Sequence, residues 1–200
     1  MYRFILASVD VVPAAVILIP VFLVLYGTVY NRDGKKCVLY CLFCLYLAAV
    51  FSLVGIPNVT YVRLELNLNL LPVWGIAADF KNSILNVLLF IPLGFFLRIL
   101  WRNFRKADAA VSFGLGLSLG IELLQIFTFR ATDINDLITN GVGTFLGWKL
   151  AVGLARKMPA IRNLPDKNNV GELYICLAIT FLVMFFAHPY LSALIWDRLL

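Results

Sequence analysis

Long apolar runs separated by short polar segments dominate this chain. A spanning helix needs about 20 mostly apolar residues, and runs of that length recur along the whole sequence. The pattern predicts about six transmembrane helices. Their approximate ranges are 11–30, 38–56, 82–101, 109–129, 136–155 and 171–187. We therefore expect an all-α, polytopic integral membrane bundle that forms a single membrane domain over residues 1–200.

The composition supports this class and argues against a soluble domain. Hydrophobic residues make up 62% of the 200 residues and charged residues 14%, with a mean hydropathy of +0.91. Ordinary soluble domains are only about 45–50% apolar. The net charge of +6 does not indicate nucleic-acid binding, because the basic residues are confined to particular segments between helices.

These basic segments predict the orientation of the chain. Lys and Arg concentrate in residues 32–36, 98–106 and 149–167, and the alternate segments are acidic or neutral. Cytoplasmic loops of membrane proteins carry an excess of Lys and Arg. We therefore expect the three basic segments in the cytoplasm and both the N-terminus and the C-terminus outside.

The longest segment between predicted helices, residues 57–82, is expected outside. Within it, residues 63–72 alternate polar and apolar positions, which fits a short strand or an extended segment at the interface. The alternative is a lid over a polar cleft, because extramembrane loops often carry recognition.

Two small-xxx-small motifs lie on the fourth and fifth predicted helices. They are Gly116-x-x-x-Gly120 and Gly143-x-x-x-Gly147. Motifs of this kind let helix backbones approach closely. Since only a short turn separates these two helices, we expect them to be antiparallel neighbours that pack through these glycines.

Polar residues gather near the outer ends of the third, fourth and fifth predicted helices. Ionisable groups at membrane depth are costly and usually occur where function needs them. The candidate site consists of Asn82, Asn86, Glu122, Gln125, Arg130, Asp133, Asp136 and Asn140. Glu122 and Gln125 share one helix face at i, i+3 spacing. The last three members share a face if the fifth helix begins early.

Helix capping is the alternative explanation for part of this set. Asp133 and Asp136 suit a helix N-terminus, where carboxylates meet the positive end of the helix dipole. Capping does not explain Glu122, which needs a partner inside the membrane. The sequence offers Lys81, Arg130, Asn86 or water for that role.

The motifs around these residues resemble the VanZ family. They are Glu122-x-x-Gln125, the run ATDINDLITNGVG at 131–143, the run NVLLFIPLG at 86–94 and the segment LNLLP at 68–72. The resemblance covers about residues 64–155, and the first helix is an addition to the usual pattern. It implies a multi-pass protein of the bacterial cytoplasmic membrane, in a family named for low-level teicoplanin resistance. Members are thought to lower the binding of lipid-bearing glycopeptides at the cell surface.

Three functions fit these observations. The first is an outward-facing envelope protein whose partners are membrane lipids, a lipid-linked cell-wall precursor or a lipoglycopeptide. The second is a membrane enzyme in which Glu122, Asp133 and Asp136 act as acid and base or as metal ligands on a lipid-linked substrate. The third is a small transporter. The sequence predicts no cofactor, no resident metal and no nucleic-acid partner, and its one histidine, His188, lies in no hydrolase motif.

Overall fold

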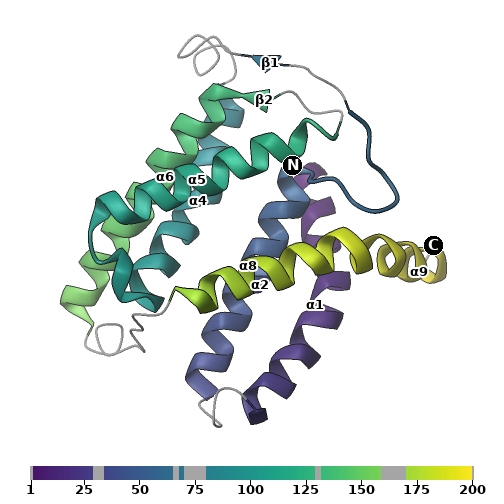
Figure 1. The fold of residues 1–200 in the computed structure, drawn as a ribbon, viewed down its shortest axis with the longest axis horizontal. Helices are drawn as coiled ribbons and strands as arrows, with labels where there is room; N and C mark the ends of the chain where they lie inside the picture. Colours follow the sequence, from purple (N-terminus) through teal and green to yellow (C-terminus); the bar gives the residue numbers. More distant parts are fainter. Residues whose placement is uncertain are drawn as a thin grey trace. The chain divides into compact units, whose positions relative to one another are not determined.

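The chain forms two compact units, which are described separately. The computed structural model describes residues 2–28, 34–64, 68–69, 80–128, 132–158 and 170–199 (Figure 1). Met1–Arg63 and Gly171–Leu200 form what we call the terminal unit, and Leu64–Val170 forms the central unit. The single membrane domain over the whole chain stays a prediction.

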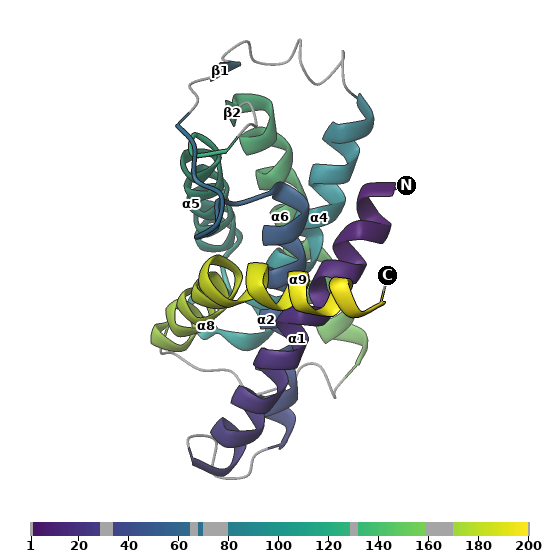
Figure 2. The same ribbon diagram turned by 90° about the vertical axis from the view of Figure 1, so that its right-hand side faces the viewer.

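The central unit is built from three long helices and a very short strand pair. The helices are α4 (Phe80–Leu100), α5 (Ala107–Gln125) and α6 (Ile134–Lys157), and the 3-10 turn η1 (Arg102–Phe104) connects α4 to α5. The strands β1 (Leu68–Asn69) and β2 (Thr132–Asp133) pair in parallel. Figure 2 shows the three helices side by side, with both strands at one end. The helix α6 packs against both α4 and α5.

Glycines bring α6 into close contact with α4. A side-chain carbon at Gly143 would clash with the carbonyl oxygen of Val87, and one at Gly147 would clash with that of Ile91. Both contacts advance by four residues on each helix, so α4 and α6 run parallel. Close backbone approach of this kind is what small-xxx-small motifs permit.

The contact between α5 and α6 uses a different glycine from the expected motif. A side-chain carbon at Gly114 would clash with the side chain of Thr144, whereas Gly116 and Gly120 have open space around that position among the described residues. The two helices are antiparallel neighbours, as predicted. The prediction that both motifs join α5 to α6 is wrong, because such a motif marks a thin helix face without specifying its neighbour.

The terminal unit contains the two N-terminal helices and a long C-terminal helical run. These are α1 (Tyr2–Thr28), α2 (Gly34–Val54), and the run of α8 (Gly171–Leu182), the π-helical turn η2 (Val183–Ala187) and α9 (His188–Leu199). The hydroxyl of Tyr40 on α2 donates to Oε2 of Glu172 on α8 at 2.5 Å. Further along, the rings of Phe51 and Phe181 meet edge to face with centroids 6.4 Å apart.

The C-terminal run continues past the point where a helix end was expected. The predicted range of the sixth helix ends at about residue 187, just before His188 and Pro189, yet the helix extends to Leu199. Pro189 has no N–H to donate to the carbonyl of Phe185, four residues earlier. That carbonyl instead accepts the backbone N–H of Val59 at 3.0 Å. The π-helical turn and this outside donor let the helix pass through the proline.

The described helices support the membrane class. Those long and apolar enough to cross a membrane are Cys37–Val54, Phe80–Leu100, Ala107–Gln125 and Gly171–Ile195, and α1 adds the shorter apolar stretch Val11–Gly27. The helix α6 lies outside this group, since polar residues occupy its first turns. The chain is an all-α membrane protein, while six spans with both termini outside remain a prediction.

Candidate functional site

Buried polar side chains line the contact between α5 and α6. We call this set the polar seam, and it consists of Ser118, Glu122, Gln125, Asn135, Thr139, Asn140 and Thr144. Each member is at most 5% exposed. The α5 members recur at i, i+4 and i+7, which places them on the one face that meets α6. Polar groups buried between helices are normally hydrogen-bonded, so the partners of each member decide what the seam can do.

Glu122 accepts a hydrogen bond from the backbone across the seam. Its Oε2 lies 2.9 Å from the backbone nitrogen of Asp133, which is the N-cap residue of α6. A helix N-terminus favours a carboxylate because its N–H groups carry partial positive charge. The sequence offered Lys81, Arg130, Asn86 or water as partners of Glu122, and the backbone N–H is a further partner with no sequence signature.

Asp133 caps α6 with its own side chain. Its Oδ1 accepts the backbone N–H of Asn135 at 2.8 Å and the side-chain amide of the same residue at 2.7 Å. The capping explanation therefore holds for Asp133. Asp136 lies in the first turn of α6 and is half-buried. The helix α6 begins at Ile134, two residues before the predicted start, so Asp133 is its N-cap and Asp136 lies in its first turn.

One turn deeper in the seam, Asn140 bridges the two helices. Its Nδ2 donates to Oγ of Ser118 at 2.8 Å. Its Oδ1 is buried and has no hydrogen-bond partner in the described part of the chain. A buried acceptor without a donor costs about 1–3 kcal/mol. This amide oxygen is therefore an acceptor inside the seam that a ligand donor would stabilise.

The candidate residues on α4 are less buried. Asn86 is half-buried, and the parallel packing of α4 on α6 places it within about one helical turn of Asn140 along the axis. Asn82 is exposed and lies inside the first turn of α4, which begins at Phe80. Arg130 lies outside the described residues.

Part of the outer segment pairs with the turn between α5 and α6. In the parallel ladder, Leu68 is opposite Thr132 and Asn69 is opposite Asp133. The expectation of a short strand is confirmed for residues 68–69, and the other residues of 65–79 lie outside the described part. Because Asp133 also binds Glu122, the strand pair lies directly at the end of the polar seam.

Some seam residues were missed by the sequence analysis. Ser118, Asn135, Thr139 and Thr144 are individually unremarkable in a helix. The hydroxyls of Thr139 and Thr144 donate to carbonyls four residues earlier, at 3.0 and 2.9 Å, which satisfies them locally. The i, i+4 step from Ser118 to Glu122 was the one signal available.

The described residues contain no group of three or more His, Cys, Asp and Glu that could hold a metal ion. Glu122 and Asp133 both accept N–H groups that organise the start of α6. His188 belongs to the terminal unit. These two carboxylates therefore have structural hydrogen-bond partners at the start of α6.

Long apolar helices with a polar seam at one end define an integral membrane protein of the all-α class. The family model described as VanZ/LLP1 matches residues 37–156. This chain therefore belongs to the VanZ/LLP1 family. The matched range includes every residue of the polar seam.

Comparison with known proteins gives one named relative. "Protein VanZ" from Enterococcus faecium is 45% identical over 94 residues, which are 46% of this chain and 55% of that protein. The matched part thus spans about half the length of that relative. No solved structure matches this chain.

Proposed function

We propose that this protein is a multi-pass protein of the bacterial cytoplasmic membrane that acts at its outer face. It lowers the susceptibility of the cell to lipid-bearing glycopeptides such as teicoplanin. Membership of the VanZ/LLP1 family and the similarity to Protein VanZ support this role.

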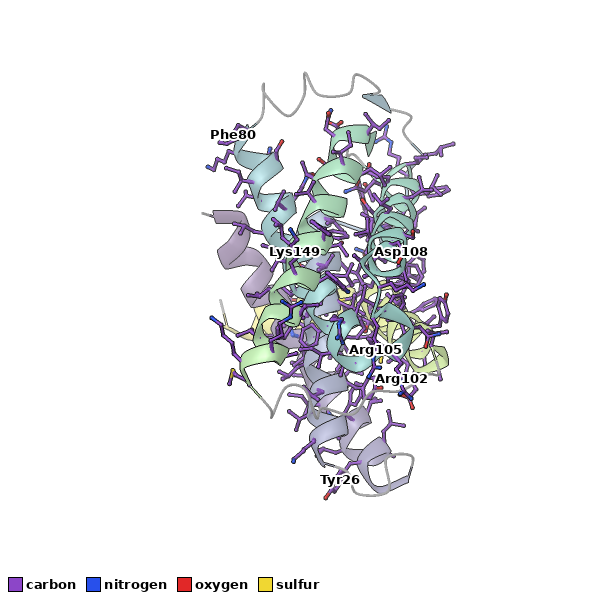
Figure 3. The ribbon with its side chains drawn as sticks, turned by 90° about the vertical axis from the view of Figure 1, so that its left-hand side faces the viewer. Tyr26, Phe80, Arg102, Arg105, Asp108 and Lys149 are labelled. Carbon is purple, nitrogen blue, oxygen red and sulfur yellow. The ribbon has the colours of Figure 1, made fainter. Side chains whose placement is uncertain are left out.

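The polar seam is the observation that carries the proposal. Figure 3 labels Phe80 at the end of the central unit where the strands lie, and Arg102 and Arg105 toward the other end. Basic residues favour the cytoplasmic side, which puts the Glu122–Asp133 end of the seam toward the outside. A lipid head group, a lipid-linked cell-wall precursor or a lipoglycopeptide carries donors that suit the carboxylate and amide acceptors found there.

The test is an expression experiment in a teicoplanin-sensitive Gram-positive host. The strains produce the wild type or one of three near-isosteric variants, Glu122→Gln, Asp133→Asn and Asp136→Asn, at matched membrane levels. Teicoplanin susceptibility and surface binding of fluorescent teicoplanin are measured together. The matched control is Asp108→Asn, which removes an exposed acid from the first turn of α5, near the opposite end of the seam helix. A glycopeptide without an acyl chain tests whether the lipid matters.

Each outcome has a distinct meaning. Protection by the wild type and by Asp108→Asn, lost in Glu122→Gln, Asp133→Asn and Asp136→Asn, supports an acidic outer site. Protection retained in all variants reduces the acids to helix caps and packing partners. If even the wild type gives no protection, the proposed glycopeptide role is wrong.

The enzyme and the transporter remain alternatives without a supporting observation among the described residues. An enzyme would consume a lipid-linked substrate in membranes that contain the wild type and would lose that activity in Glu122→Gln. Assays for substrate turnover in the same strains therefore separate catalysis from binding.

A further inference from the structure

The end of the central unit opposite the strand pair is strongly basic. Residues 98–109 and 149–158 contain one acidic residue, Asp108, and seven basic ones. The basic residues are Arg98, Arg102, Arg105, Lys106, Lys149, Arg156 and Lys157. All of these except Arg98 are exposed. Figure 3 labels Arg102 and Arg105 in this region, below Phe80 at the other end.

Buried aromatic side chains hold the η1 turn in place, so the backbone that carries its exposed cations is fixed by packing. Trp101 and Phe104 are 0% and 7% exposed, while Arg102 between them is exposed. The indole N–H of Trp148 on α6 donates to the carbonyl of Phe104 at 3.0 Å. The rings of Phe104 and Phe113 meet edge to face at 5.4 Å. The turn is thereby joined to both α5 and α6.

The last turn of α6 brings further cations to the same depth. Arg156 and Lys157 lie in that turn, and the parallel packing of α6 on α4 places them level with Arg102 beyond the end of α4. These exposed cations make this end of the unit strongly basic.

An exposed apolar stripe on α6 leads to one of these cations. Leu146, Leu150, Gly153 and Lys157 recur at i, i+4, i+7 and i+11, which places them on one helix face. Leu146 and Leu150 are 43% and 51% exposed. Gly153 has nothing within 4 Å of its side-chain position. The stripe extends about 16 Å along the helix axis, a length comparable to a lipid acyl chain.

We propose that this end of the central unit binds anionic phospholipids of the cytoplasmic leaflet. The exposed cations at the end of α6 hold the phosphate, the η1 cations add to the positive charge at the same depth, and an acyl chain lies along the stripe from Leu146 to Lys157. The charge selects an anionic head group, because arginine and lysine form charge-assisted hydrogen bonds with phosphate oxygens. The apolar stripe selects a ligand that carries an acyl chain over free phosphate. This inference does not depend on the proposed glycopeptide role.

The test uses the full-length protein in a neutral detergent and follows its thermal unfolding. Four additives are titrated: phosphatidylglycerol, phosphatidylcholine with the same acyl chains, glycerol phosphate and inorganic phosphate. We expect phosphatidylglycerol to raise the unfolding temperature and the other three to leave it unchanged. Ligands that bind only the folded state shift unfolding by mass action.

Matched substitutions locate the site. Lys157→Gln should weaken the apparent affinity for phosphatidylglycerol about fivefold, the effect of one cation near an anionic surface. Lys157→Arg keeps the charge and should retain the affinity. Lys81→Gln removes an exposed lysine from the opposite end of the unit and should have no effect. Leu150→Asn changes the apolar stripe and leaves every cation in place. It should therefore weaken the binding of phosphatidylglycerol by removing the contact with the acyl chain.

Several results would overturn the inference. Equal stabilisation by phosphatidylcholine would mean that charge does not select the ligand. Equal stabilisation by inorganic phosphate would mean that the site takes a soluble anion. Loss of affinity in Lys81→Gln to the same degree as in Lys157→Gln would mean that net charge alone governs binding.

Discussion

The carboxylate of Glu122 and the backbone N–H of Asp133 form a 2.9 Å hydrogen bond that joins α5 to the start of α6. Asp133 also caps α6 and pairs with Asn69 in the strand ladder. A single residue thus links the seam, the helix start and the outer strand. Substitutions in this region have to separate stability from activity, and the predictions below are arranged to do so.

Replacing Glu122 should show how much its charge and its side-chain acceptor each contribute to the stability of the protein. Glu122→Gln keeps an oxygen acceptor for the N–H of Asp133 and should destabilise the protein by about 1 kcal/mol, the difference between charged and neutral hydrogen bonds. Glu122→Ala leaves that N–H without its acceptor and should cost about 2–3 kcal/mol. Denaturant titration in detergent measures both. An alanine variant as stable as the wild type would show that the hydrogen bond contributes nothing.

The cap residue of α6 gives a contrasting pair. Asp133→Asn should leave the free energy of unfolding within about 0.5 kcal/mol, because asparagine caps helices as well as aspartate. Asp133→Ala should cost about 1 kcal/mol. Thermal unfolding of the two variants checks this. Loss of glycopeptide protection in a stable Asp133→Asn protein would then be due to the charge and not to the fold.

Ser118 and Asn140 should be energetically coupled. Their 2.8 Å hydrogen bond crosses from α5 to α6, and bonds between membrane helices are worth about 0.6 kcal/mol on average and up to about 1.7. A double-mutant cycle with Ser118→Ala and Asn140→Leu should give a coupling energy in that range. Additive effects of the two substitutions would contradict the contact.

Alanine substitution at two helical glycines, Gly147 and Gly120, should change stability in opposite directions. Gly147→Ala forces a side-chain carbon against the carbonyl of Ile91, and overpacking of this kind costs about 1–3 kcal/mol. Gly120→Ala enters open space and removes the entropic cost of a helical glycine, so it should be neutral or stabilising by up to about 1 kcal/mol. Unfolding of both variants under one condition makes the comparison. Equal effects would mean that α4 does not pack on Gly147.

Local features of the chain could be predicted because their physical causes are local. Runs of about 20 apolar residues define membrane helices without reference to any neighbour, and α4 and α6 begin and end within two residues of the predicted bounds. The capping role of Asp133 follows from its place just before the predicted fifth helix, where a carboxylate meets the positive end of the helix dipole. The predictions that were wrong concerned features that depend on partners distant in the sequence. The C-terminal helix passes Pro189 because Val59, from another segment, supplies a donor for the carbonyl of Phe185.

By itself, the sequence determined the class of protein, its main helices and the region where polar groups gather. Only the tertiary structure decided which faces meet. The motif Gly143-x-x-x-Gly147 meets α4 and not α5, because periodicity defines a thin helix face but not the neighbour that fills it. The tertiary structure also decided that Glu122 binds the backbone of Asp133. Every residue but proline carries the same backbone N–H, and only folding selects which one reaches a buried carboxylate.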